Sequence, residues 1–431
     1  KYQTYPEILA QHGYAIGHTG KGWGPGNWKL DGRTHNPAGP AWNEQTMEVP
    51  EGIRATDYAS NFADFLESRD QDQPFCFWFG ASEPHRKFGK GLGAAAGKKA
   101  DEVSIPDFLP DHPEVRSDMM DYAFEIEWFD QHLGRMLALL EEKGELDNTL
   151  IIVTSDNGMA FPRAKANAYE FGIHVPMAVC WGEELPKAQV SDALVGFVDL
   201  APTILAAVGL SGPTEFPMTG ESLLPLLRGE GRSKTAVFAS RERHSSVRYQ
   251  SLAYPQRAMR TGPYLYIRNF RPERWPAGAP QKYGSGSYPK KSEIEQAELG
   301  PMHAAYHDID ACPTLSLLVE GVEDPELKTY LDLAVQHRPA EELFDVAKDP
   351  HCLNNLAGKP EFAAVQAELR EQLAAYLTET GDPRMLGKGD IWETYPRYSR
   401  LRAFPGPDWA KKNPDQIPEV PWLESHWAKQ D

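Results

Sequence analysis

The chain has 431 residues, more than a single hydrophobic core usually supports, so we expect one large domain and a smaller one. Hydrophobic residues make up 41% and charged residues 25%, which is ordinary for a globular protein and argues against overall disorder. The formal net charge of -18, without a basic stripe, disfavours a nucleic-acid partner, and no apolar run approaches the roughly 20 residues of a membrane span.

The first half of the chain alternates helical and strand patterns. "YPEILAQHGY" predicts a short helix that leads into the strand "YAIGHTG". A helix over 55–69 leads into the buried strand "FCFWFGA", and the longest helix, over 116–143, leads into the strand "TLIIVTS". The 55–69 helix places four apolar side chains on one face: Tyr58, Phe62, Phe65 and Leu66. Three such steps predict a parallel sheet with helices on its faces.

The second half changes character near Gly231. Before it, "PMAVCW" predicts one more strand and 199–209 one more helix. After it, "AVFAS", "QRAMRT" and "YLYIRNF" are short segments suited to antiparallel pairing, followed by a loop over 272–290 and a helix over 362–380. We therefore predict an α/β fold with a mostly parallel central sheet and helices on both faces, plus a smaller C-terminal α+β subdomain with an antiparallel sheet. The expected domains are 1–230 and 231–380, with a surface-wrapping tail over 381–431.

The four cysteines lack the paired spacing of a zinc site. Cys76 and Cys180 lie within apolar runs and are expected to be small buried side chains. Cys312 and Cys352 lie in polar surroundings and could form a disulfide in an oxidising compartment, which the sequence leaves open.

Polar residues follow three of the predicted strands. Lys21 follows "YAIGHTG", His85 follows "FCFWFGASEP", and Asp156 with Asn157 follows "TLIIVTS", with Lys165 nine residues after Asp156. Ligands collect beyond the carboxyl ends of parallel strands. Carboxylate and amide oxygens are ligands that Ca²⁺ or Mg²⁺ takes, and the cationic side chains can face an anion bound to that cation. The pattern indicates a metal-assisted anion site.

Each of these residues also has a simpler interpretation. An isolated Asp-Asn-Gly is more often a turn, and a lysine in a Gly-rich loop is usually solvated. "GKGWGPG" lacks the spacing of a nucleotide-binding loop. His85 alone could cap a strand end, and Lys165 alone could be surface charge. Their shared position after strands favours a common site.

Five segments together resemble the sulfatase family of the alkaline phosphatase superfamily, from about residue 4 to about residue 380: "YPEILAQHGYAIGHTGKGWGPG", "EPH", "TSDNG", "KANAYEFGIHVP" and "EELFDVAKDPHCLNNLA". Within that family, "EPHR", "FPRAKANAY", "TGESLLPLL" and "YPQRAMRT" are most similar to the heparan N-sulfatase (N-sulfoglucosamine sulfohydrolase) branch. The resemblance implies a hydrolase of sulfate esters or sulfamates that acts on a sulfated carbohydrate, in glycosaminoglycan degradation.

The resemblance also implies roles for the polar residues. Asp156 and Asn157 would ligate Ca²⁺, with Mg²⁺ as an alternative. Lys21, His85 and Lys165 would contact the sulfate or its bridging atom, with His85 as the acid for the leaving group. A secreted, periplasmic or lysosomal location is implied too, although no targeting signal is visible, and the oligomeric state stays open.

Two departures from the family pattern concern the chemistry. The formylglycine nucleophile is made within C/S-x-P-x-R, which this sequence does not contain, and the paired aspartates of the family's first strand are also absent. We expect both upstream of Lys1, in an N-terminally longer protein. Where many relatives have Lys-x-His, this chain has Lys21-Gly22-Trp23, so Trp23 would form an apolar wall or stack on a sugar ring.

The candidates for binding an acidic sugar are His244, Arg248 and Arg257. An equally good interpretation is that these residues are surface charges on an antiparallel sheet. Two other functions remain open. One is hydrolysis of phosphoric or phosphonic esters on the same scaffold, and the other is non-catalytic binding of a sulfated glycan.

Overall fold

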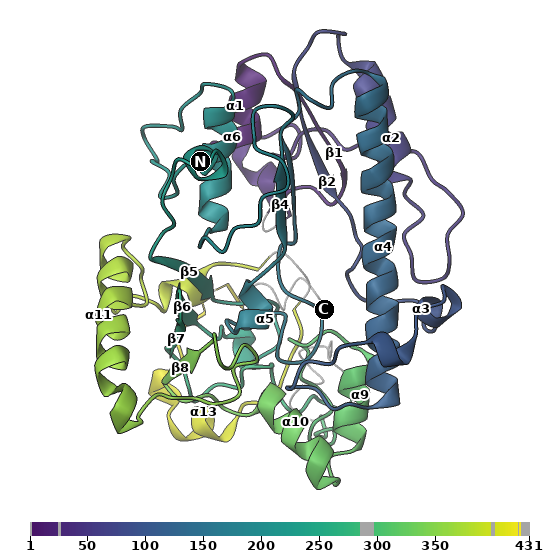
Figure 1. Ribbon diagram of the computed structural model, residues 1–431. Coiled ribbons are helices and arrows are strands. Elements are labelled where there is room, and N and C mark those ends of the chain that lie inside the picture. Colours follow the sequence, from purple (N-terminus) through teal and green to yellow (C-terminus); the bar gives the residue numbers. More distant parts are fainter. Residues whose placement is uncertain (1, 25–26, 285–296, 398–400, 421, 424–431) are drawn as a thin grey trace. The chain divides into compact units, whose positions relative to one another are not determined.

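The computed structural model describes residues 2–24, 27–284, 297–397, 401–420 and 422–423 (Figure 1). Part of the loop predicted over 272–290 lies outside these residues. The chain divides into two compact units. The first unit comprises 1–103, 116–154 and 176–235, and the second comprises 104–115, 155–175 and 236–431. The expected domain limits stay predictions.

Helices and strands alternate in the first unit, as its apolar periodicity predicts. The longest helix, α4, begins just before the unit's 116–154 segment and is conspicuous in Figure 1. The elements are α1 Tyr5–Gln11, β1 Ala15–Gly20, α2 Tyr58–Ser68, β2 Phe75–Gly80, α3 Leu92–Ala95, α4 Pro113–Glu142, β3 Ile151–Thr154, β4 Met177–Cys180, α6 Leu200–Ala207 and α7 Leu224–Leu227, with 3-10 turns at Trp28–Asp31, Ala100–Glu102 and Phe197–Asp199.

Strands β1 and β2 pair in parallel, from Ala15 opposite Phe75 to Gly20 opposite Gly80. One face of this pair packs on α2 and α4, and the other face packs on α1 and α6. The four apolar side chains predicted on one face of the 55–69 helix are all buried in that packing. The expected parallel strands with helices on both faces are therefore confirmed for this pair.

Strands β3 and β4 depart from the expected parallel arrangement. They pair antiparallel, with Ile151 opposite Cys180 and Thr154 opposite Met177. A parallel pair needs a crossover that carries the chain back to the starting end. Residues 155–176 contain only the four-residue helix α5 (Glu170–Ile173), and they leave and re-enter at the same end of the pair. The local helix-strand order could not reveal this reversal.

The second unit contains the predicted antiparallel sheet, in the order β5-β6-β7-β8. Helix α11 lies against one face of this sheet (Figure 1), where its buried leucines pack, and the segment around Tyr169 covers the other face. The elements are α5, β5 Ala236–Arg241, β6 Gln256–Thr261, β7 Tyr264–Asn269, α9 Pro313–Glu320, α10 Pro325–Val335, β8 Glu341–Asp345, α11 Ala363–Glu379, α12 Ile391–Thr394 and α13 Asp408–Lys412, with 3-10 turns at Tyr249–Ser251, Pro360–Phe362 and Pro414–Gln416.

The cysteines differ from their predicted environments. Cys180 is exposed and Cys76 is half-buried, because each lies on a strand of a two-stranded sheet. Cys312 and Cys352 are both buried and are not joined by a disulfide. Cys312 instead accepts a hydrogen bond from the backbone of Leu315 at the start of α9. In the part of the chain that the structure describes, no helix is both long and apolar enough to cross a membrane.

Candidate active site

Lys21 is held through its backbone at the carboxyl end of the parallel pair. Its N–H donates to the carbonyl oxygen of Gly80 at 2.6 Å. Two glycines make this approach possible: a Cβ on Gly80 would lie 2.0 Å from the Lys21 carbonyl oxygen, and one on Gly20 would lie 2.2 Å from the Gly80 oxygen. Asn43 accepts a hydrogen bond from the Gly20 N–H at 2.7 Å. The strand ends are thereby clamped, and the Lys21 side chain is exposed.

Trp23 continues the same turn. Its backbone exchanges two hydrogen bonds with the side chain of Asn36, at 2.9 and 2.7 Å, and the residue is 40% exposed. An exposed, backbone-anchored indole suits stacking on a flat ligand. His18, the nearest histidine in sequence, is buried in β1, and burial lowers its pKa. It is therefore neutral at pH 7 and covered, which does not favour a role in proton transfer to a ligand.

His85 lies in the turn that follows β2. Its N–H donates to the Ser82 carbonyl oxygen at 2.8 Å, and its ring Nδ1 lies 2.7 Å from the Arg86 carbonyl oxygen. A carbonyl can only accept, so Nδ1 carries a hydrogen and donates it. The neutral ring then has a bare Nε2, and only the imidazolium can donate from that atom. Because the residue is exposed, Nε2 is the atom suited to exchange a proton with a substrate.

Buried charges on either side of His85 fix this turn. Glu83 accepts from the Tyr58 hydroxyl at 2.8 Å and from the Arg54 N–H at 2.9 Å. Arg86 forms a buried bidentate ion pair with Asp118 of α4 and stacks on Phe88. Sequence reasoning missed these anchors, although Asp118 directly precedes the buried Met119 and Met120 in the α4 pattern.

Asp156 and Asn157 follow β3 directly, and the Asn157 amide donates from Nδ2 to Asp156 Oδ1 at 2.6 Å. Gly158 is required here, because a Cβ would lie 1.8 Å from the Phe171 carbonyl oxygen. The exposed Asp156 carboxylate and the Asn157 Oδ1 are hard oxygen donors that fit Ca²⁺ or Mg²⁺. They can supply only part of a ligand set. Within the described ranges, no group of three or more His, Cys, Asp or Glu side chains is placed to hold a metal ion.

Lys165 is held by its side chain. Its Nζ pairs with Asp310 Oδ2 at 2.7 Å, and the two side chains are 11% and 20% exposed. Its N–H donates to the Met159 carbonyl oxygen at 3.1 Å, which closes a compact turn. The ammonium group is therefore ordered before any ligand arrives. Asp310 gave no sequence signal, because it lies in a loop without periodicity.

His244 and Arg248 share one partner, Asp308. Arg248 pairs with Asp308 Oδ2, and His244 Nδ1 lies 3.3 Å from Oδ1. Arg248 also donates to the carbonyl oxygens of Trp275 and Pro276 and is almost fully buried. His244 keeps 31% of its side chain exposed, so it remains suited to touch a ligand, whereas the geometry favours a structural role for Arg248.

Arg257 is likewise built into the protein. It pairs with Asp382 and Glu242, each at 2.7 Å, and is 3% exposed. Both interpretations made from the sequence place this guanidinium at the surface, and the structure buries it in an ion-pair network. A direct contact with a sugar stays a prediction that this burial does not favour.

The predicted residues thus form two groups. Lys21, Trp23 and His85 lie near the strand ends of the first unit. In the second unit, Lys165 is joined to His244 and Arg248 through Asp308 and Asp310. Convergence of the two groups with Asp156 around one cation stays a prediction.

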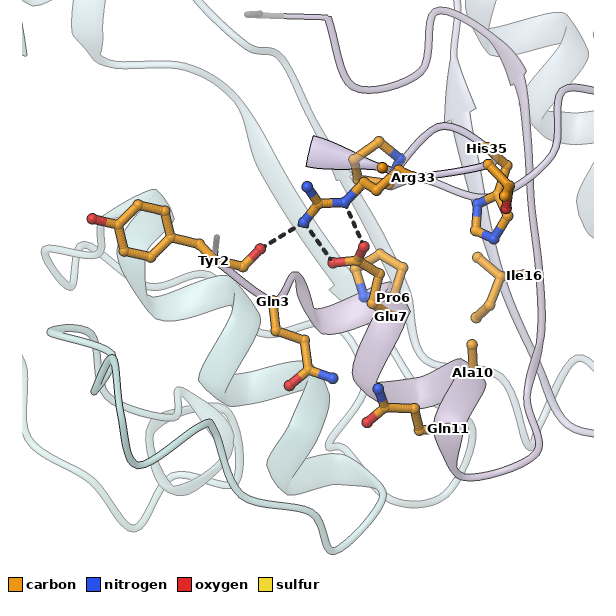
Figure 2. Close-up of a pocket in the computed structure, with 12 residues that line it drawn as sticks. Tyr2, Gln3, Pro6, Glu7, Ala10, Gln11, Ile16, Arg33 and His35 are labelled. Atoms are coloured by element: carbon orange, nitrogen blue, oxygen red, sulfur yellow. Dashed lines mark hydrogen bonds and ion pairs between the residues drawn. The ribbon is translucent and has the colours of Figure 1, made fainter. Parts of the chain in front are cut away.

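A cavity of about 680 Å³ in the first unit lies beside α1 (Figure 2). Arg33 lines it and donates to Glu7 Oε1 at 2.6 Å and to the Tyr2 carbonyl oxygen at 2.7 Å. Its lining residues include none of the predicted site residues. We therefore do not assign the chemistry to this cavity.

Two family models match the chain. Residues 1–210 match the model described as sulfatase, and residues 164–273 match the model described as N-sulphoglucosamine sulphohydrolase, C-terminal. The first match contains Lys21, His85, Asp156 and Lys165. The second contains Lys165 together with His244, Arg248 and Arg257.

Individual relatives agree with these matches. Human N-sulphoglucosamine sulphohydrolase is 30% identical over 428 residues, covering 91% of this chain and 77% of the human protein. An ulvan-active sulfatase of Formosa agariphila is also 30% identical, over 73% of this chain, which spans about half of that protein (47%). A solved structure of a protein in complex with its substrate D-glucosamine-2-N,6-O-disulfate has a TM-score of 0.54 at 18% identity, covering 89% of this chain and 83% of its own, and shows the shared fold.

Proposed function

The chain belongs to the sulfatase family of sulfuric ester hydrolases, and we propose that it acts on a sulfated glycan, hydrolysing the sulfamate of N-sulfated glucosamine residues such as those of heparan sulfate. The observation that carries this proposal is the match of residues 164–273 to the C-terminal model of N-sulphoglucosamine sulphohydrolase. That segment contains the second-unit residues predicted to select the substrate. The 30% identity to the human enzyme over most of the chain supports the same substrate class.

The proposed chemistry assigns charge stabilisation to the lysines and proton transfer to His85. Sulfate transfer builds negative charge on the sulfate oxygens and on the leaving atom, and fixed cations stabilise that charge. Lys21 and Lys165 supply two such cations. The imidazolium form of His85 would donate its Nε2 proton to the leaving nitrogen as the N–S bond breaks and the sulfur is transferred to the nucleophile, while Nδ1–H stays hydrogen-bonded to the Arg86 carbonyl oxygen.

Sulfatases are generally metal-dependent, and we propose Ca²⁺ as the ion, with Asp156 and Asn157 among its ligands. A bound cation would supply further stabilisation of charge on the sulfate oxygens. Asp156→Ala is expected to lower the calcium content of the purified protein, measured by elemental analysis. Calcium content equal to that of the wild type would remove Asp156 from the ligand set.

The proposed nucleophile is a formylglycine, in a motif that residues 1–431 do not contain, so activity is to be measured on the complete gene product. A secreted, periplasmic or lysosomal location is part of the same proposal.

The test compares sulfate release from N-sulfated glucosamine with release from 6-O-sulfated and 2-O-sulfated sugars. We expect the N-sulfated compound to be preferred, and His85→Ala to lower kcat about 10²- to 10⁴-fold while substrate binding is largely kept. His12→Ala, an exposed histidine at the end of α1, is the matched control and should keep wild-type kcat. Hydrolysis of phosphonate esters in place of sulfated sugars, or binding of sulfated glycan without turnover, would overturn the proposal.

A further inference from the structure

Two carboxylates two residues apart, Asp308 and Asp310, lie in the short segment that precedes α9. This segment is rigidly packed. The Asp308 N–H donates to the Ala277 carbonyl oxygen at 3.1 Å, and the Ile309 N–H donates to the Tyr306 carbonyl oxygen at 3.0 Å. Ile309, between the two acids, is buried with Tyr306 in an apolar cluster that includes residues of α9 and α10. The two carboxylates therefore have a fixed backbone.

Asp308 is a buried carboxylate that binds several basic side chains. It pairs with the guanidinium groups of Arg241 and Arg248, and His244 Nδ1 lies 3.3 Å from it. Burial alone would raise the pKa of Asp308, but Arg248 and Arg241 hold that pKa far below its usual range. Asp308 is thus ionised at any physiological pH, and it orients the partly exposed His244 ring.

Asp310 orients Lys165 in the way that Asp308 orients His244. The Lys165 backbone is already fixed by the neighbouring Arg163, which donates to the carbonyl oxygens of Leu333 at 2.8 Å and Cys352 at 2.5 Å. The lysine side chain beyond that backbone has four rotatable bonds, and ordering it costs conformational entropy. The 2.7 Å ion pair with Asp310 holds the ammonium in one place before substrate binds.

We propose that Asp310 is a positioning residue for the reaction, which fixes the Lys165 ammonium to the same rigid segment that fixes His244 through Asp308. This inference rests on the proposed function, since it gives Lys165 the sulfate and His244 the sugar. Its consequence is that the distance between the sulfate-binding cation and the sugar-binding imidazole is set by two side chains on one short backbone. Preordering of this kind favours the reaction by reducing the entropy lost on binding.

The test is a double-mutant cycle in the complete gene product, with glucosamine N-sulfate as substrate. Asp310→Ala is expected to lower kcat/KM about 10- to 100-fold, the usual effect of removing a supporting partner. If Asp310 acts only through Lys165, Asp310→Ala in the Lys165→Ala background should cause no further loss. Asp310→Glu should restore part of the activity. Asp310→Asn, which keeps the shape of the side chain, provides the same readout if Asp310→Ala does not fold.

Asp332→Ala is the matched control, because it breaks the exposed Lys328–Asp332 pair of α10 in the same unit. It should keep wild-type kcat/KM. Independent, multiplying losses from Lys165→Ala and Asp310→Ala, or a folded Asp310 variant with wild-type kcat/KM, would overturn the inference. A wild-type protein that releases no sulfate from glucosamine N-sulfate would overturn the proposed function itself, which is a distinguishable result.

Discussion

Lys21 in the first unit and Lys165 in the second are proposed to do similar work, yet they are held differently. The position of Lys21 is set by its backbone, through strand pairing and the close approach of Gly20 and Gly80. The position of the Lys165 ammonium group is set by the ion pair of its side chain with Asp310, beside a network of buried arginines and carboxylates. The first arrangement depends on the absence of side-chain atoms at two positions. The second depends on opposite charges that must all remain paired.

The largest effect should come from breaking that charge network at Arg257. Arg257→Met leaves Asp382 and Glu242 without their shared guanidinium, so we expect the free energy of unfolding to fall by about 3 kcal/mol, the low end for buried pairs because both acids are partly exposed. Urea unfolding measures this. Arg271→Met, which removes the exposed pair with Asp390, should cost less than about 1 kcal/mol. A stable Arg257→Met with a raised KM would instead identify Arg257 as a sugar contact.

A smaller loss is expected from Gly80→Ala in the first unit. The new Cβ would lie 2.0 Å from the Lys21 carbonyl oxygen. Because that oxygen belongs to the backbone, it cannot shift without a cost in free energy. We expect a loss of about 1–3 kcal/mol in the free energy of unfolding, together with reduced activity, because Lys21 must shift. Gly134→Ala, inside α4 with no atom near the added Cβ, should be neutral or stabilise by up to about 1 kcal/mol. Equal effects of the two substitutions would contradict the backbone clamp at Lys21.

The smallest effect concerns Glu125, a buried residue of α4 that interacts electrostatically with Glu83 and Arg86 on either side of His85. Its Oε1 has no hydrogen-bond partner among the described residues. Burial raises its pKa to about 8, the carboxylates of Glu83 and Asp121 act in the same direction, and Arg86 opposes them. In the unfolded chain the group ionises near pH 4. Between these values the folded protein holds a proton that the unfolded chain lacks, so stability falls as the pH rises.

Glu125→Gln should remove this dependence. Its free energy of unfolding, measured by urea at pH 6 and at pH 7, should decline less than that of the wild type. Over that one pH unit the difference is at most about 1.4 kcal/mol. Parallel declines in the two proteins would show that Glu125 is ionised in the folded state.

Local pattern predicted the elements well, because helices such as α2 and α4 and strands such as β2 have strong apolar periodicity. It failed on the direction of β4, because the same residues can pair in either direction and the choice depends on where the intervening segment packs. It also placed Cys180 in a buried strand, whereas the two-stranded sheet leaves that residue exposed.

The candidate site likewise contains residues that local sequence could predict and residues that it could not. Lys21, His85 and Asp156 could be proposed from their positions after strands, a feature of local sequence. Asp308 and Asp310 could not, because their importance comes from partners 60 or more residues away. The burial of Arg257 was hidden for the same reason, since its partner Asp382 lies 125 residues along the chain.

The second unit is assembled from three separate stretches of chain, and this affects how the protein is made. Residues 104–115 and 155–175 leave the ribosome well before 236–431. A 2.8 Å contact between Asp107 Oδ2 and His351 Nδ1, and the hydrogen bond from Arg163 to the Cys352 carbonyl oxygen, join early segments to late ones. Phe108, almost fully buried in the finished protein, contacts Phe171 of the early segment and His351 of the late one, so its burial is completed only when the late segment is made. Until then the nascent chain exposes part of this apolar surface, and such exposure favours aggregation before folding is complete.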